Sequence, residues 1–221
     1  MISDYRDIIS LFVEADRIVN RNIPAYMIGG GAMMKYGIKN QTKDIDIVVR
    51  STEDFTTIND AFFKMGFESL MPEHTYDRLA LSQILIRDDY RIDLFNRTVC
   101  GKLHLSEGMM SRSKQELFTR GLTLNVCAPE DILIFKSVTE REGDRDDATN
   151  IIRSHAIRWD LIVSEIKHQI SLGEDVWVTW MAAFFNELAE RDVPIGALKE
   201  IGLLSDIYFE EFEKKNIDCG K

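Results

Sequence analysis

Two acidic residues in one short, otherwise apolar run place the strongest constraint on how this chain can fold. Polar and apolar residues alternate in Asp44-Ile45-Asp46-Ile47, and the apolar run then continues to Val49. Successive side chains of a β-strand point to opposite faces, so Asp44 and Asp46 share a face while Ile45 and Ile47 point into the core. Two carboxylates held side by side repel each other. A divalent cation between them, such as Mg²⁺, is the usual reason for building such a pair.

A run of glycines precedes this predicted strand. Gly29, Gly30 and Gly31 follow an apolar segment, residues 25–28, that is typical of a buried strand, and they precede a predicted helix that stops at Gly37. Without side chains, Gly29 and Gly30 allow a phosphate group to approach the backbone. A helix start also presents free N–H groups and a partial positive charge to an anion. The glycines and the acid pair are each weak signals alone, but together they indicate a site for a phosphate compound and its metal ion.

A third acidic residue, Asp93, lies in a similar apolar frame, Arg91-Ile92-Asp93-Leu94-Phe95. This run and residues 79–86 predict two strands joined by a hairpin turn at Asp88-Asp89. The alternative for Asp93 is a solvent-exposed acid at the end of a strand. Its apolar neighbours on both sides disfavour that alternative.

The pattern of Gly29-Gly30, thirteen intervening residues and Asp44-Ile45-Asp46-Ile47 closely resembles the signature of the polymerase β-type nucleotidyltransferase superfamily. The resemblance implies an α+β fold with a mixed sheet of the nucleotidyltransferase type, flanked by helices. It implies catalytic and metal-binding roles for Asp44, Asp46 and Asp93, with Mg²⁺ or Mn²⁺ as the cofactor. It also implies that Gly29 and Gly30 bind the nucleotide.

A later segment, Pro129-Glu130-Asp131 followed by Lys136, is similar to one in the bacterial and archaeal branch that contains abortive-infection and toxin-type nucleotidyltransferases. The resemblance covers roughly residues 24 to 155. It implies that Lys136 reaches the triphosphate as a point charge. A surface lysine on an apolar helix is the alternative.

That branch continues with Arg-x-Lys-Asp-x-x-Asp, which this chain matches at Arg141, Asp144 and Asp147 but with Gly143 where lysine is common. The departure weakens the expectation that this stretch binds phosphate. We expect Arg141, Asp144 and Asp147 to form an internal salt-bridge network that orients the helices.

The remaining periodicity predicts how the chain is organised. Apolar spacing indicates helices over residues 3–20, 52–65 and 113–119, and a strand over 122–126. Pro129 with two acids behind it is typical of a helix start, and helical spacing continues to about residue 215. We therefore predict a nucleotidyltransferase α+β domain, residues 1–127, and a helical domain packed against it, residues 128–221.

Composition narrows the class of protein. Apolar residues make up 45% and charged residues 29% of the chain, as in soluble globular proteins. No signal-peptide pattern and no apolar stretch of roughly 20 residues is present, and the three cysteines are far apart, so we expect a cytoplasmic protein without membrane contact. The net charge of −10 argues against a nucleic-acid coat protein. Residues 97–120 nevertheless hold five basic and two acidic residues. This segment is either a basic patch that binds the molecule receiving the transferred group, or a solvated face.

The expected activity is transfer of a nucleoside monophosphate from an NTP to a hydroxyl, with release of pyrophosphate. An RNA end, a protein and a small molecule all remain open as the acceptor, the last as in antibiotic-inactivating transferases. The alternative from another class is a nucleotide-binding regulatory or toxin–antitoxin component without turnover, with an antitoxin-like protein as partner. The three intact acids favour the enzyme.

Overall fold

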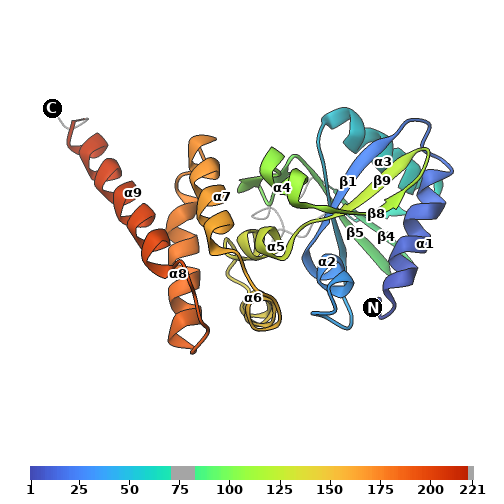
Figure 1. Cartoon of the computed structure of the whole chain (residues 1–221). Helices are drawn as coiled ribbons and strands as arrows, with labels where there is room; N and C mark the ends of the chain where they lie inside the picture. The colour runs from blue at the N-terminus through green and yellow to red at the C-terminus, as the bar shows by residue number, and fades with distance from the viewer. Residues whose placement is uncertain (71–82, 219–221) are drawn as a thin grey trace. The chain divides into compact units, whose positions relative to one another are not determined.

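The computed structural model describes residues 1–70 and 83–218, with side chains for all of these except residues 216–218. The chain divides into two compact units, Met1–Ala128 and Pro129–Lys221. The first combines strands and helices and the second is helical (Figure 1). The proposed domain limits, 1–127 and 128–221, differ from these units by one residue.

A mixed sheet organises the first unit. In the described part of the chain it has seven strands, in the order β3-β4-β5-β2-β1-β9-β8. The β2–β5 and β1–β9 pairs are parallel and the other neighbours are antiparallel. These strands are β1 (Ile23–Ile28), β2 (Ile45–Val49), β3 (Glu68–Ser69), β4 (Gln83–Arg87), β5 (Tyr90–Asn96), β8 (Lys114–Phe118) and β9 (Leu122–Val126). A separate ribbon pairs β6 (Thr98–Val99) with β7 (Leu103–His104).

Helices of the first unit bury apolar side chains in its core. They are α1 (Tyr5–Asp16), α2 (Gly29–Lys35), α3 (Thr52–Lys64) and α4 (Glu107–Arg112). Phe12 of α1 and Phe62 of α3 are fully buried, and their rings meet edge to face with centroids 6.1 Å apart. The Ser51 hydroxyl accepts a hydrogen bond from the Asp54 amide and so caps the start of α3.

Strand β2 lies inside the sheet, between β5 and β1. Four of its five side chains are completely buried, namely Ile45, Ile47, Val48 and Val49. A strand covered on both faces reads as a nearly continuous apolar run, which explains this stretch of sequence. Asp46 is the polar exception within the strand, and its side chain is half-buried.

The second unit consists of helices packed through aromatic and aliphatic side chains. Trp159 and Phe185 meet edge to face with centroids 5.8 Å apart. No helix in the described residues is both long enough and apolar enough to span a bilayer. The helices are α5 (Pro129–Lys136), α6 (Glu142–Ser154), α7 (Trp159–Ser171), α8 (Trp177–Glu190) and α9 (Leu198–Asp218).

The structure confirms the predicted α+β class, with its mixed sheet and helical C-terminal half. The predicted hairpin is also present, because Arg87 pairs with Tyr90 across Asp88 and Asp89, and Asp88 has a left-handed backbone with φ of 51°. Residues 79–82, which were predicted to begin the first strand of that hairpin, lie outside the described residues.

The predicted helix over residues 113–119 is wrong, because Lys114–Phe118 forms strand β8. Lysine, glutamine, glutamate and leucine are good helix formers, so local propensity favoured a helix. Pairing with β9 overrides this preference by satisfying backbone groups along the sheet edge. A register shift between Gln115 and Leu117 also breaks the alternation by which a strand is recognised.

Candidate active site

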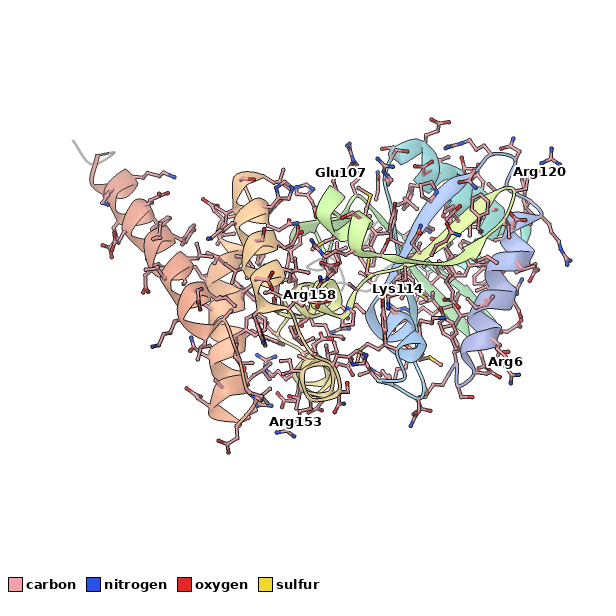
Figure 2. All side chains as sticks on the ribbon, in the orientation of Figure 1. Arg6, Glu107, Lys114, Arg120, Arg153 and Arg158 are labelled. Atoms are coloured by element: carbon pink, nitrogen blue, oxygen red, sulfur yellow. The ribbon has the colours of Figure 1, made fainter. Side chains whose placement is uncertain are left out.

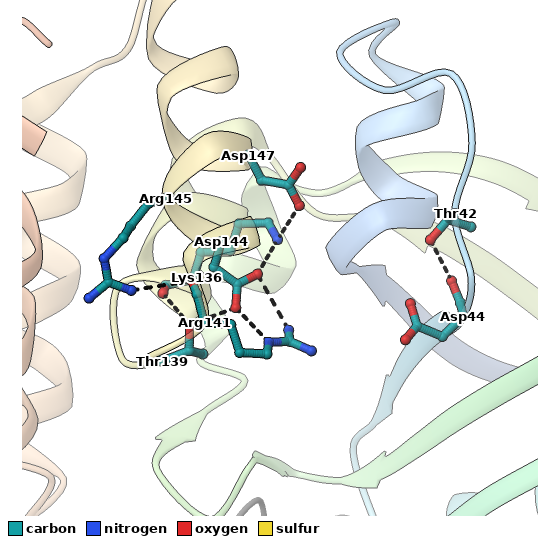
Figure 3. Close-up of polar contacts among 8 residues, drawn as sticks. All are labelled: Thr42, Asp44, Lys136, Thr139, Arg141, Asp144, Arg145 and Asp147. Atoms are coloured by element: carbon teal, nitrogen blue, oxygen red, sulfur yellow. Dashed lines mark hydrogen bonds and ion pairs between the residues drawn. The ribbon is translucent and has the colours of Figure 1, made fainter. Parts of the chain in front are cut away.

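The predicted acid pair lies where the chain enters β2. Asp44 immediately precedes the strand and Asp46 is its second residue, and both side chains are half-buried. The Thr42 hydroxyl donates a hydrogen bond of 2.9 Å to the backbone carbonyl oxygen of Asp44 (Figure 3). This bond fixes the backbone just before the strand begins. The alternation predicted from the sequence is present, with Ile45 and Ile47 buried and the two acids reaching the surface.

The carboxylate of Asp46 lies directly against the backbone of Gly29. Asp46 pairs with Ile28 across the antiparallel β1–β2 ladder, which brings the first residue of α2 beside it. A Cβ atom added to Gly29 would overlap the Asp46 carboxylate. The φ of Gly29 is also +61°, a left-handed conformation that side-chain-bearing residues avoid. Position 29 therefore requires glycine for two independent reasons.

The next two glycines also lie close to side chains. A Cβ atom on Gly30 would overlap the hydroxyl of Thr42, which is itself buried, and one on Gly31 would lie 3.0 Å from the sulfur of Met27. The glycines thus lie against Asp46 of the acid pair and against Thr42, which precedes that pair. Thr42 is a site residue that sequence reasoning missed, and no pattern around it indicated its role.

Asp93 is brought beside the pair by the sheet. It lies opposite Asp46 in the parallel β2–β5 register and is only 5% exposed. Its two carboxylate oxygens accept hydrogen bonds from Nε and Nη2 of Arg91 at 2.7 and 2.9 Å. Sequence reasoning missed Arg91 as a partner. The signal was available, since residues two apart on a strand share a face.

These three acids come together on adjacent strands but do not form a ready metal cluster. Across residues 1–70 and 83–218, no group of three or more His, Cys, Asp or Glu side chains is arranged to hold a metal ion. Arg91 engages both oxygens of Asp93. Mg²⁺ commonly takes one or two carboxylates together with phosphate oxygens of its substrate. Asp44 and Asp46, beside the start of α2, have the hard oxygen donors that such an ion prefers.

Lys136, in the helical unit, lies at the centre of a buried charge network (Figure 3). Its ammonium nitrogen is 2.7 Å from Asp144 Oδ1 and 2.8 Å from Asp147 Oδ2. Asp144 also accepts hydrogen bonds from Nε of Arg141 at 2.8 Å and from the Thr139 hydroxyl at 2.6 Å. The predicted network of Arg141, Asp144 and Asp147 is confirmed, with Lys136 as an additional member.

The charges in this network support one another. Burial alone would lower the pKa of Lys136, but Asp144 and Asp147 together raise it above its ordinary value. Burial likewise opposes ionisation of Asp144, but Lys136 and Arg141 lower the pKa of this carboxyl to about 2. Lys136 and Asp144 are therefore both charged at neutral pH. Binding of the triphosphate by Lys136 stays a prediction.

Basic residues of the segment 97–120 are spread over different surroundings. Lys102 is buried, and the Lys114 ammonium lies 5.5 Å from the centroid of the Tyr36 ring. Figure 2 shows Lys114 and Arg120 well apart, since Lys114 begins β8 and Arg120 follows its end. A role in acceptor binding stays a prediction.

Comparisons with known proteins give little more. No family model matches this sequence, and no curated protein matches it either. Among solved structures, one similar chain is that of the "Crystal Structure of ANT(2")-Ia in complex with adenylyl-2"-tobramycin". The match has 14% sequence identity and a TM-score of 0.48, and it covers 83% of this chain and 97% of that chain. A likeness of this strength carries no argument about function, which therefore rests on the residues of this chain.

Paired glycine substitutions test the contact between Gly29 and Asp46. Gly37 also has a left-handed φ, +69°, but nothing lies within 4 Å of a Cβ added there. We expect Gly37→Ala to lower the free energy of unfolding by about 1–2 kcal/mol, the cost of the backbone conformation alone. Gly29→Ala should lower it further, because the Asp46 carboxylate must also move. Urea denaturation measures both losses, and equal losses would contradict the packing described here.

The low pKa of Asp144 predicts a stability change in acid. A carboxyl with a pKa of about 2 when folded and 3.8 otherwise contributes about 2 kcal/mol of stability above pH 4. This contribution is lost as the pH falls from about 4 towards 2, because the folded pKa lies below the unfolded one. The stability deficit of Asp144→Asn should therefore be constant near neutral pH and shrink below about pH 4.

Tryptophan fluorescence during urea denaturation measures this deficit, since Trp159, Trp177 and Trp180 all lie in the helical unit. Asp146→Asn is the matched control, because Asp146 is exposed on the same helix. A deficit for Asp144→Asn that did not change with pH would show that Asp144 titrates normally.

Proposed function

We propose that this chain is a Mg²⁺- or Mn²⁺-dependent nucleotidyltransferase that moves a nucleoside monophosphate from an NTP to a hydroxyl, with release of pyrophosphate. One observation carries the proposal. The Asp46 carboxylate lies against the Gly29 backbone where α2 begins, with Asp93 beside it in register on the neighbouring strand. This arrangement supports the proposal because carboxylate oxygens, which a divalent ion prefers, lie beside a helix start that has no side-chain cap, and the free N–H groups of a helix start favour an anion.

Asp44 and Asp46 would hold the divalent ion together with phosphate oxygens of the nucleotide. A bound ion of this kind neutralises phosphate charge and orients the oxygens of an in-line displacement. The backbone of Gly29 and Gly30 would contact the triphosphate, and Lys136 is proposed as a further triphosphate ligand. Two of the three hydrogens on the Lys136 ammonium serve Asp144 and Asp147, which leaves one for such a contact.

Asp93 would complete the metal site and accept the proton of the attacking hydroxyl. This role requires that the ion pair with Arg91 open when the nucleotide and its metal bind. Exchange of a guanidinium for a metal ion would keep the Asp93 carboxylate neutralised throughout. Arg91 would then be released beside the newly bound phosphates, where a positive charge is favourable.

The same ion pair supports the rival function, a nucleotide-binding regulatory or toxin–antitoxin component without turnover. If the Arg91–Asp93 pair stays closed, Asp93 can neither hold a metal ion nor accept a proton.

If the chain is a transferase, its acceptor is an RNA end, a protein or a small molecule. A polynucleotide acceptor predicts binding that weakens steeply as salt is added, whereas a small neutral acceptor does not.

Metal dependence of nucleotide binding gives the first test. We expect an NTP to bind with Mg²⁺ or Mn²⁺ present and to bind far more weakly in EDTA, because Asp44 and Asp46 alone repel the triphosphate. Asp44→Asn should weaken metal-dependent binding, and Asp7→Asn, an exposed acid of α1, should leave it unchanged. Calorimetric titration measures both effects. Equal affinity for the NTP with and without metal would contradict the proposed metal site at Asp44 and Asp46.

Transfer of label from α-labelled NTPs to components of a cell extract tests turnover and identifies the acceptor. Asp93→Asn keeps the side-chain shape but removes basicity, so transfer should fall by about 10²–10⁴-fold while nucleotide affinity falls only modestly. Transfer near the wild-type rate by folded Asp93→Asn would exclude a catalytic role for Asp93. Metal-dependent NTP binding by the wild type with no labelled product from any NTP would favour the regulatory function.

A further inference from the structure

The helical unit contains a pocket that the proposed chemistry does not use. Its volume is about 420 Å³, and its lining comes from the segment between α5 and α6 and from helices α6, α8 and α9. The lining residues are Thr139, Glu140, Arg145, Thr179, Trp180, Ala183, Phe184, Glu187 and Phe209. A pocket of this size suits a small organic molecule.

Three aromatic side chains form its apolar walls. Phe184 is buried and packs edge to face on Phe185, and Trp180 packs edge to face on Trp177. These contacts hold two walls in place before any ligand binds. Phe209 of α9 is 52% exposed, a large apolar surface to leave in water. The walls therefore offer both rigid aromatic faces and an apolar area that a ligand would cover.

The charged side chains that line the pocket carry a net negative charge. Nε of Arg145 donates a hydrogen bond of 2.6 Å to Glu187, and its guanidinium carbon lies 5.5 Å from the centroid of the Phe184 ring. Glu187 also pairs with Arg191, which pairs with Glu142, so the charges of these four side chains balance. An aromatic wall of the pocket already lies against a cation. Glu140 is exposed and makes no ion pair with any residue that the structure describes. The lining keeps one uncompensated negative charge.

The helical unit as a whole also carries a negative net charge. Residues 129–221 contain 20 acidic and 11 basic residues, whereas residues 1–128 contain 17 and 16. Almost all of the net charge of −10 therefore belongs to the helical half. A surface of one sign raises the local concentration of ligands of the opposite sign.

We propose that this pocket binds a small organic cation, with an ammonium group near Glu140 and an apolar body against Trp180, Phe184 and Phe209. Aromatic faces attract cations through their negative ring faces, and the carboxylate adds charge. Anions are disfavoured by both features. The site needs neither the metal nor the nucleotide of the proposed transfer reaction.

Benzyltrimethylammonium is a suitable probe, with benzyl alcohol as a neutral comparison that keeps the ring. Titration of the full chain by calorimetry should give an affinity for the cation about 3- to 30-fold higher than for the alcohol, as cation–π and charge contacts imply. Trp180 lines the pocket, so tryptophan fluorescence should change with the same midpoint. Equal affinity for the two compounds, or binding of neither, would overturn the proposal.

Matched variants locate the site. Glu140→Gln and Phe209→Ala should each weaken binding of the cation several-fold. The control variants Glu190→Gln and Phe212→Ala should not weaken binding of the cation. They change exposed residues of α8 and α9 outside the lining, and Phe212 is as exposed as Phe209. Asp44→Asn should also leave cation binding intact, which separates this site from the nucleotide site. Equal weakening by the lining variants and their controls would place the cation elsewhere and overturn the proposal.

Discussion

Contact between the Asp46 carboxylate and the Gly29 backbone joins the strand that carries the acids to the turn that begins α2. It exists because β1 and β2 pair with Ile28 opposite Asp46, and because position 29 has no side chain. Parallel pairing of β2 with β5 then brings Asp93 to the same place. The arrangement of all the candidate catalytic groups in the first unit follows from these two strand pairings.

Much of the arrangement of the acids could be predicted from the sequence, because local sequence patterns determine it. A central strand with two half-exposed acids must alternate, so Asp44, Ile45, Asp46 and Ile47 specified both their secondary structure and their faces. Pro129 specified a helix start in the same local way. Features determined by near neighbours along the chain could be predicted.

Features determined by distant partners could not. Lys114–Phe118 is a strand because β9 lies beside it, although its own residues favour a helix. Thr42 fills the space next to Gly30 only after the chain has folded back on itself. The ion pair between Arg91 and Asp93 occupies an intermediate position, since the spacing placed both residues on one face but did not show that they would bond.

Since ladder pairing holds the turn and the acids together, the connecting segment between them has little to do with their geometry. Thr42 is tied to Ile2 through paired backbone hydrogen bonds and to Asp44 through its hydroxyl, so the chain is fixed again before β2 begins. We therefore expect the chain to tolerate a change of length between Gly37 and Thr42. Lengthening a flexible loop adds only a small entropic cost of closure, on the order of 0.6 kcal/mol for each doubling. A longer loop there would leave unchanged the two strand pairings that position Asp46 and Asp93.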